Sequence, residues 1–471
     1  MRAPTRRFAA VAISAAAVLL SGMTPAYAAP AGEPVNIITD YAIRPDGDRA
    51  PRTRPAIIPK TPEQVKAEAR RKGATYTADA DKMLATVKAP DPAKYDYITP
   101  SGCDANDKAD DEGGWTKNHF SWCRRNYEQK SEAKRCDSQG TCVIHGTLTT
   151  KFTVIGFGEH TQDPDRPSKT DRSIRFQLYV SSMVPTGVFR SVPESTFSLS
   201  MRCITNNPAH CSAPDFNGDT KAVAQWQADG ATDTEFISPG QIPGSIPDGQ
   251  PNRDQFVHAD VVAVGSGKVP GYAQAPSVEH PGTSIRFDSA WYNGTAKRGS
   301  IFTVVEPFLR FSRAADSGYK QVADHLWTAL NRPQDTKPPF SDKQLPGGTM
   351  GNPLTRLYGK YYADGRNQSR VDSNRYYAKA WGCDPYFPNW NTAIDPNKPP
   401  NGGTLNECDE YPFASTYQGA SRWKTDGNQF KNMFSARPVH WSHNRKAGDV
   451  LLNFYNWDRI PEKGQYFIKV E

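Results

Sequence analysis

The residues best suited to chemistry lie near the C-terminus, in the stretch CDEYPFASTYQGA from Cys408 to Ala420. Asp409 and Glu410 place two adjacent carboxylates between a cysteine and a short aromatic run. Positioned carboxylates act as general bases or hold a divalent cation. Neighbouring side chains of an extended strand point to opposite faces, so these two cannot easily share one ion unless the backbone turns. Taken alone, the pair would be interpreted as a polar cap at the turn before Pro412.

Basic and aromatic side chains are interleaved around this stretch. Residues 340–471 contain 17 Lys and Arg against 13 Asp and Glu, a net charge of +4. The basic residues alternate with Tyr and Trp, as in Arg375-Tyr376-Tyr377 and Arg422-Trp423-Lys424. Cations contact phosphates and flat rings stack on bases, so the composition is typical of a nucleic-acid surface. The same composition also fits a solvated face around a small aromatic core.

Three sequence elements of this region occur in a recognisable order. They are CDEYPFASTYQGA, the later HNRKAG, and a closing strand over 465–470. With the upstream cluster Asp372-Ser373-Asn374-Arg375, they resemble the NucA/NucB family of secreted bacterial deoxyribonucleases. The resemblance covers roughly the last 100 to 130 residues. It implies hydrolysis of DNA phosphodiesters aided by a divalent metal, in a small α+β domain similar to the ββα-metal nucleases.

The resemblance, read with the chemistry of phosphodiester cleavage, assigns the two carboxylates separate roles. We expect Asp409 to be the general base and Glu410 to be a metal ligand, with the reverse assignment left open. Asn444 is expected to add an oxygen ligand from a helix across the site. Hard oxygen donors suit Mg²⁺ or Mn²⁺. Arg375 and Arg445 are expected to hold a phosphate, because a guanidinium fork matches phosphate oxygens.

Two further roles stay open from the sequence. Asp372 either ligates the metal or pairs with Arg375. His440 and His443 have a structural role, a DNA-contacting role or a catalytic one. If either histidine were the base, the assignment of Asp409 would fail.

The first 28 residues have the features of a secretory signal peptide. A basic start is followed by an apolar run from Phe8 to Leu20 and by the small-x-small signal Ala26-Tyr27-Ala28. The run is too short to span roughly 30 Å of hydrocarbon, and no later segment approaches the roughly 18 apolar residues of a membrane span, so we expect a secreted, extracellular protein. The formal charge of +7 includes three arginines of this segment, which leaves +4. This mild excess does not by itself indicate nucleic-acid binding.

Eight cysteines follow the signal segment, and an even number in an exported chain predicts disulfides. Sequence neighbours favour the pairs Cys136–Cys142, Cys203–Cys211, Cys383–Cys408 and Cys103–Cys123. A zinc site is not favoured, because the sequence has no Cys-x-x-Cys pair. The segment 385–406, inside the third of these pairs, departs from the compact members of the family. It either shapes substrate access or is a surface excursion.

The chain is expected to be α+β overall, in three parts after the signal. Residues 29–100 are predicted to be a linker or pro-segment with short helices, one of them capped by Thr61 and a second over 79–87. Residues 101–332 contain short alternating runs separated by turns, which predict an antiparallel β-sandwich-like domain that closes on a helix over 316–332. A Pro- and Gly-rich segment over 333–348 predicts a boundary before the nuclease-like domain, residues 340–471.

The leading hypothesis is a secreted, metal-dependent DNA endonuclease without sequence specificity. A second hypothesis is a cell-surface binding or structural protein that keeps a nuclease-like scaffold. A third is a nuclease toxin, with residues 29–330 as a delivery region.

Overall fold

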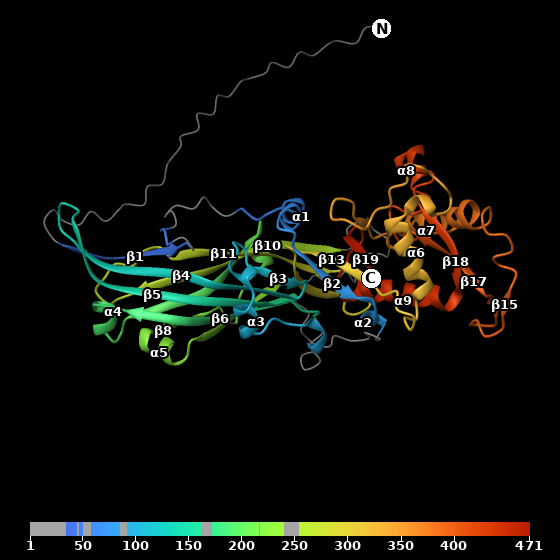
Figure 1. Ribbon diagram of the computed structural model, residues 1–471. Coiled ribbons are helices and arrows are strands. Elements are labelled where there is room, and N and C mark those ends of the chain that lie inside the picture. The colour runs from blue at the N-terminus through green and yellow to red at the C-terminus, as the bar shows by residue number, and fades with distance from the viewer. Residues whose placement is uncertain are drawn as a thin grey trace, which may run out of the picture.

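The computed structural model describes residues 34–44, 47–49, 58–84, 92–161, 172–215, 217–239 and 254–471 (Figure 1). Long strands fill one end of the elongated molecule, and helices with short strands fill the other. The signal-peptide prediction for residues 1–28 falls outside the described residues and stays a prediction.

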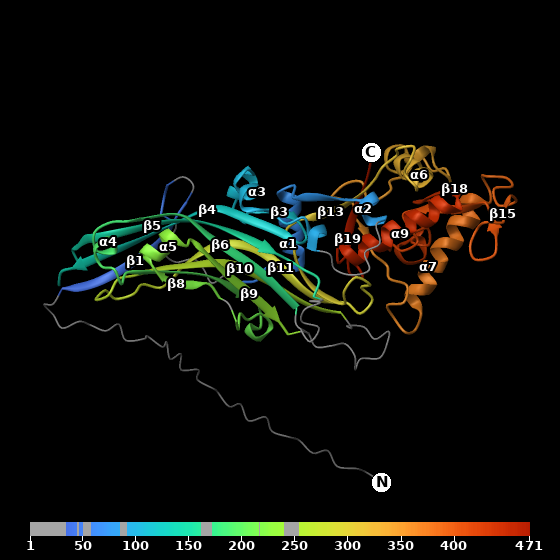
Figure 2. The same ribbon diagram turned by 90° about the horizontal axis from the view of Figure 1, so that it is seen from below.

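Two antiparallel sheets build the strand-rich end (Figure 2). The first has the order β1-β4-β5-β6-β9 with β3 added to β4, and the second has the order β12-β11-β10-β7-β8. The strands of the first sheet are β1 (Val35–Ile43), β3 (Trp115–Asn118), β4 (Ser121–Cys136), β5 (Cys142–Phe157), β6 (Arg172–Pro185) and β9 (Ala231–Ser238). Those of the second are β7 (Thr196–Ile204), β8 (Asp219–Ala222), β10 (Gln255–Lys268), β11 (Val278–Ser289) and β12 (Arg298–Phe302).

One apolar core joins the two sheets. Phe152 and Val154 of β5 lie in the same buried cluster as Leu199 of β7, Val261 of β10 and Phe287 of β11. Burial of each such side chain is worth about 1.5–3 kcal/mol. The alternation predicted from the sequence is therefore confirmed as strands, and most of them run longer than expected.

The linker or pro-segment predicted over 29–100 is wrong for one segment near its start. Val35–Ile43 forms β1 and pairs antiparallel with β4, from Val35 opposite Cys136 to Ile43 opposite Glu128. Ile38 and Tyr41 are buried in this strand. Residues 29–60 are on average rich in Pro, Ala and Arg, and this composition predicts no strand. The nine residues of β1 differ from that average and are suited to a strand.

The two predicted N-terminal helices are present. In α1 (Pro62–Arg71) the Thr61 hydroxyl accepts a hydrogen bond from the Gln64 N–H, and the Gln64 side chain accepts one from the Thr61 N–H. This is the capping box that the sequence predicts. The second helix is α2 (Ala80–Leu84), and the predicted continuation over 85–87 falls outside the described residues.

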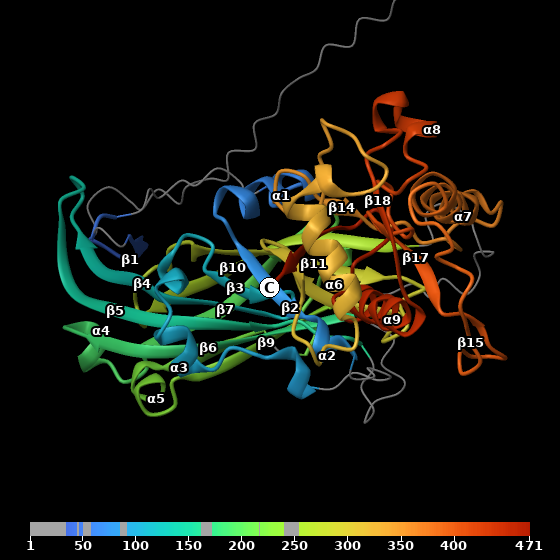
Figure 3. The same ribbon diagram turned by 45° about the vertical axis from the view of Figure 1, so that its right-hand side comes forward.

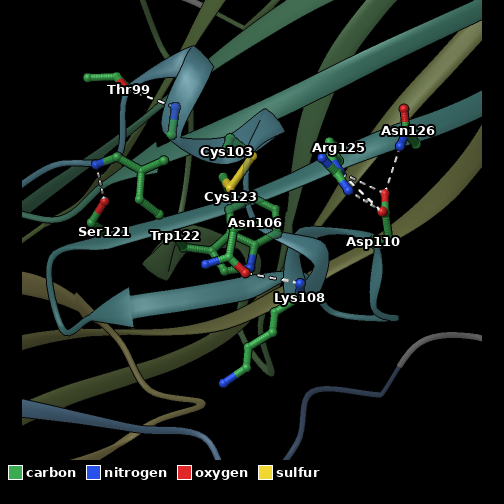
Figure 4. Close-up of a disulfide and its surroundings, with 12 residues drawn as sticks. Thr99, Cys103, Asn106, Lys108, Asp110, Ser121, Trp122, Cys123, Arg125 and Asn126 are labelled. Atoms are coloured by element: carbon green, nitrogen blue, oxygen red, sulfur yellow. Dashed lines mark hydrogen bonds and ion pairs between the residues drawn. A yellow bond between two sulfur atoms is a disulfide. The ribbon is translucent and has the colours of Figure 1, made fainter.

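All four expected disulfides are present. Figure 4 shows Cys103–Cys123, which ties α3 (Pro100–Asp104) to β4. The other short helices of this half are η1 (Pro92–Tyr95), η2 (Asp107–Asp110), α4 (Val188–Ser191), η3 (Pro208–His210) and α5 (Val223–Ala228).

A small mixed sheet joins the two ends of the molecule, in the order β14-β19-β13-β2. Its strands are β2 (Thr75–Asp79), β13 (Glu306–Phe311), β14 (Leu354–Thr355) and β19 (Gln465–Val470). The central strand β13 pairs in parallel with both β2 and β19, the last strand of the chain.

The remaining elements gather around the end of this sheet (Figure 3). They are α6 (Lys320–Asn331), η4 (Pro333–Asp335), α7 (Arg366–Tyr377), the π-helical turn η5 (Ala378–Cys383), β15 (Ile394–Asp395), β16 (Gly403–Thr404), β17 (Asn406–Tyr411), α8 (Trp423–Asp426), η6 (Asn428–Phe430), β18 (Ser435–His440) and α9 (Trp441–Trp457). Helix α6 contacts α9, β17, β18 and β19. The predicted division at 333–348 stays a prediction, and the packing of α6 and β13 joins its two sides.

The α+β class is confirmed, with strands predominating. Across the part of the chain that the structure describes, no helix is both long and apolar enough to cross a membrane.

Candidate active site

Strand β17 carries the two adjacent carboxylates, and it pairs antiparallel with β18. Asp409 lies opposite Arg437, and Glu410 lies opposite Ala436. The strand sends the two side chains to different partners, because successive residues alternate between its faces. Asp409 contacts a histidine of α6, whereas Glu410 lies near Arg375 of α7.

Asp409 is buried, with 5 % of its surface exposed. Its Oδ2 lies 2.6 Å from Nδ1 of His325, and Nε2 of that imidazole lies 2.6 Å from the Ser435 hydroxyl. His325 and Ser435 are themselves buried. The Asp409 carboxylate, which extends from β17, is therefore fixed in position by a hydrogen bond to a residue of α6.

Glu410 lies half-buried beside several charged groups. Burial, followed by the negative charge of Asp409, raises the pKa of Glu410 to about 8, while the Arg375 guanidinium opposes the shift. Without a further positive charge nearby, this carboxyl group holds its proton at neutral pH.

Asn444 extends from the first turn of α9 toward the same region. Its Nδ2 donates a hydrogen bond of 2.8 Å to Oε2 of Glu407. The other oxygen of Glu407 receives Lys398 Nζ at 2.7 Å. Lys398 belongs to the segment 385–406, so that segment contributes a charged group beside the site.

These side chains line one cleft with a volume of about 940 Å³. Its wall includes Asp409, Glu410 and Asn444 together with Arg375. The other polar residues of the wall are Arg356, Tyr358, Lys360, Gln368, Lys379, Trp390, Lys398, Thr404, Asn406, Glu407, Ser415 and Tyr455. The cleft thus combines a few acidic groups with cations contributed by residues 356–360, α7, η5 and the segment 385–406.

The loop that follows β17 is fixed by one buried amide. Asn374 of α7 donates from Nδ2 to the carbonyl oxygens of Ala414 (2.8 Å) and Thr416 (3.1 Å). Its Oδ1 accepts hydrogen bonds from the N–H and the hydroxyl of Ser421. A Cβ on Gly419 would lie 2.4 Å from this side chain, so glycine is required at that position. Asn374, adjacent to Arg375 in the sequence, therefore links the position of α7 to that of the motif.

Cys383–Cys408 connects the same two elements by a covalent bond. Cys383 ends the π-helical turn that continues α7, and Cys408 directly precedes Asp409. The disulfide that the sequence predicts therefore joins η5 to the strand that carries both carboxylates.

The other residues singled out in the sequence do not line the cleft. Asp372 is exposed and lies 3.6 Å from Arg375, which corresponds to the pairing alternative. Arg445 is exposed and is not among the residues that line the cleft. His440 accepts a hydrogen bond from Ser442 N–H at the start of α9, and His443 accepts one from Gln321 N–H. Neither histidine lines the cleft.

The sequence interpretation missed His325, Glu407 and Lys398. His325 stands 84 residues from Asp409 in the chain, and no local pattern connects the two. Glu407 directly precedes the stretch CDEYPFASTYQGA. Its acidic side chain beside this stretch is the one sequence feature that could have indicated a role in the site.

A divalent cation fits the donors of this cleft. Within the described residues, no three His, Cys, Asp or Glu side chains are grouped as a complete metal cage. Oxygen donors from Glu410, Asn444 and Glu407 nevertheless line the cleft, and burial opposes the ionisation of Glu410 unless a further positive charge is present. Mg²⁺ is typically held by one or two carboxylates, with waters and substrate phosphates completing its shell. Such an ion suits an open set of oxygen donors.

Comparison with known proteins identifies the C-terminal region. Residues 361–469 match the family model "Deoxyribonuclease NucA/NucB". No curated protein matches the chain. No solved structure matches it either.

Proposed function

Starting from a C-terminal deoxyribonuclease domain of the NucA/NucB family, we propose that the chain is a secreted endonuclease that hydrolyses DNA phosphodiesters in the cleft around Asp409 and Glu410, with a divalent cation and without sequence preference. The observation that carries the proposal is the placement of the acidic pair, Asn444 and Arg375 along one cleft inside the matched region.

Asp409 acts as the general base and takes the proton of the attacking water. Its Oδ2 is bonded to His325, which leaves the second oxygen for that water. Glu410 and Asn444 would hold the cation, Mg²⁺ or Mn²⁺, and the bound cation would stabilise charge on the phosphoryl and leaving oxygens. A cation bound beside Glu410 would favour its ionised form at neutral pH despite the raised pKa.

Arg375 contacts a phosphate beside the scissile bond, because its largely exposed guanidinium extends from α7 at the cleft wall. Lys379 and Lys398 add positive charge along the same wall. Contacts of this kind position a nucleic acid but carry no sequence information. They support cleavage of DNA of any sequence.

The order of elements supports a likeness to the ββα-metal nucleases. Two antiparallel strands, β17 and β18, are followed directly by α9, which carries Asn444. In this proposal a carboxylate on the first strand takes the role that a histidine usually has in that group.

Secretion is part of the proposal. Four disulfides among the described residues fit an oxidising compartment, and residues 1–28 have the pattern of a signal peptide.

The proposal predicts that the purified chain degrades plasmid DNA in Mg²⁺ or Mn²⁺, and that EDTA stops the reaction. Glu410→Gln should abolish cleavage, because it removes the charge that holds the cation. Glu194→Gln, an exposed position in the strand-rich half, should cleave like the wild type. Plasmid conversion on gels gives the rates, and circular dichroism confirms the fold of each variant.

Salt-dependent DNA binding without hydrolysis in either metal would reject the enzyme and favour a nuclease-like scaffold that binds DNA. Full activity of Glu410→Gln would reject the assigned role of this residue alone.

A further inference from the structure

A histidine outside the family-matched region reaches the proposed base. His325 lies on α6, before residues 361–469, and only 2 % of its surface is exposed. Its two ring nitrogens are both engaged, Nδ1 with Asp409 Oδ2 and Nε2 with the Ser435 hydroxyl, each at 2.6 Å. The imidazole therefore bridges β17 and β18 from a helix that neither strand adjoins in sequence.

The chemistry of the partners fixes the direction of these hydrogen bonds. An ionised carboxylate can only accept, so Nδ1–H donates to Asp409. In the neutral imidazole Nε2 then accepts from the Ser435 hydroxyl. Ser435 is the first residue of β18 and lies opposite Tyr411 of β17, so the acceptor nitrogen is anchored to the same strand pair. The ring cannot rotate without losing one of the two bonds.

A bridging imidazole of this kind restrains the carboxylate that it contacts. Asp409 has only two side-chain torsions, and a short hydrogen bond to a fixed donor selects one rotamer. With Oδ2 committed to His325, the other oxygen keeps a defined direction. A base that is misplaced by about 1 Å can lose on the order of 100-fold in rate, so such a restraint bears directly on turnover.

A purely structural histidine is the competing interpretation, because buried histidines are commonly satisfied by nearby polar groups. Two features distinguish His325. Its acidic partner is a residue of the cleft wall. The hydrogen bond to that partner comes from Nδ1 alone. An asparagine amide can take the place of Nδ1, so a substitution can separate the two interpretations.

We propose that His325 is a positioning residue for DNA hydrolysis, which orients Asp409 through the Nδ1–H hydrogen bond and makes α6 part of the active site. The inference rests on the proposed function, in which Asp409 is the base. It goes beyond that function, because it assigns a role to a residue that the family match does not include.

The test compares three variants of the full chain on plasmid DNA in Mn²⁺, with kcat and KM measured separately. His325→Leu removes both hydrogen bonds and should lower kcat by roughly 10- to 100-fold, the usual effect of losing an outer-sphere partner, with KM nearly unchanged. His325→Asn keeps a donor at the Nδ1 position and should recover most of kcat. His325→Gln places its amide near the Nε2 position and should stay as slow as His325→Leu.

Thermal melting of each variant shows whether it is folded. The Asn and Gln variants are a matched pair, because both carry an amide and differ only in its position. If His325→Leu does not fold, the ratio of kcat between the Asn and Gln variants still decides. A ratio well above one supports the inference, and equal values overturn it. A wild-type chain that does not cleave DNA would remove the proposed function and this inference together. An active wild type with equal Asn and Gln variants would remove the inference alone.

Discussion

Among single residues, Glu410 is a carboxyl group whose ionisation is disfavoured in the folded protein. Burial and the neighbouring Asp409 raise its pKa to about 8, from an ordinary value of 4.5. The unfolded chain releases this proton near pH 4.5, whereas the folded chain keeps it until about pH 8. In that window the folded state binds more protons, so the free energy of unfolding falls as the pH rises.

Glu410→Gln should therefore flatten the pH dependence of stability. In EDTA, the free energy of unfolding of the wild type should fall between pH 5 and pH 8. The fall should be at most about 1.4 kcal/mol for each pKa unit by which the folded and unfolded states differ. The variant should lose less, since its amide does not ionise. Differential scanning fluorimetry across this range measures the effect. Identical slopes for the two proteins would contradict the assigned cause.

Mn²⁺ adds a second readout to the same experiment. The ion should raise the melting temperature of the wild type at pH 8, because it binds the folded state and stabilises the ionised carboxylate. It should have little effect on Glu410→Gln.

The sequence predicted part of this site at residue level. Asp409, Glu410, Asn444 and Arg375 were identified because they belong to short motifs, and all four line the cleft. His325 was not identifiable, because a contact between residues far apart in the chain leaves no local pattern. The pKa of Glu410 was equally out of reach, since it depends on burial.

At the scale of elements, the position of β17 relative to α7 depends on the Cys383–Cys408 bond and on Asn374. Replacing both cysteines by serine opens a loop with a sequence separation of 25 residues. The chain-entropy estimate puts the loss of stability at about 3.5 kcal/mol. Because the strand carries both carboxylates, kcat should fall as well. Urea denaturation and plasmid cleavage measure the two effects.

The matched control is Cys136–Cys142, which closes the turn between β4 and β5 with a separation of 6 residues. Its double serine variant should lose less stability and keep full activity, because the bond lies at the strand-rich end of the molecule. Equal losses of activity in the two double variants would argue against a specific role for Cys383–Cys408.

Elements with strong local signals were predictable and elements without them were not. The capping box of α1 is a local signal and appears where expected, and β6 and β7 lie within the region 101–332 where alternating runs predict strands. The strand β1 was hidden by the composition of its surroundings. The strand β2 has five residues between two helices, and it is a strand because β13 is available to pair with it.

At the scale of the whole molecule, the nuclease region does not stand apart from the rest of the chain. Leu309 of β13 and Leu326 of α6 belong to the same apolar cluster as Val450 of α9 and Ile468 of β19. A fragment of residues 340–471 would lose the parallel partner of β19, the helix α6 and His325.

The fragment 340–471 should therefore melt well below the full chain and lose most of its DNA cleavage. A fragment that begins at residue 306 restores β13 and α6 and should recover part of both properties. Thermal melting and plasmid cleavage on the two fragments and the full chain measure this. Full activity of 340–471 would show that the predicted division at 333–348 also separates function.

The parallel pairing of β13 with β19 has a consequence for the order of events in synthesis. Leu309 pairs with Ile468, which lies far from it in the sequence. Contacts between such distant segments form slowly, because a long loop must close before they stabilise the fold. The sheet that supports the cleft thus cannot be completed until residues 465–470 have left the ribosome and reached β13. If the chain is secreted, as proposed, export before this pairing forms would keep a completed cleft away from the DNA of the cell that makes it.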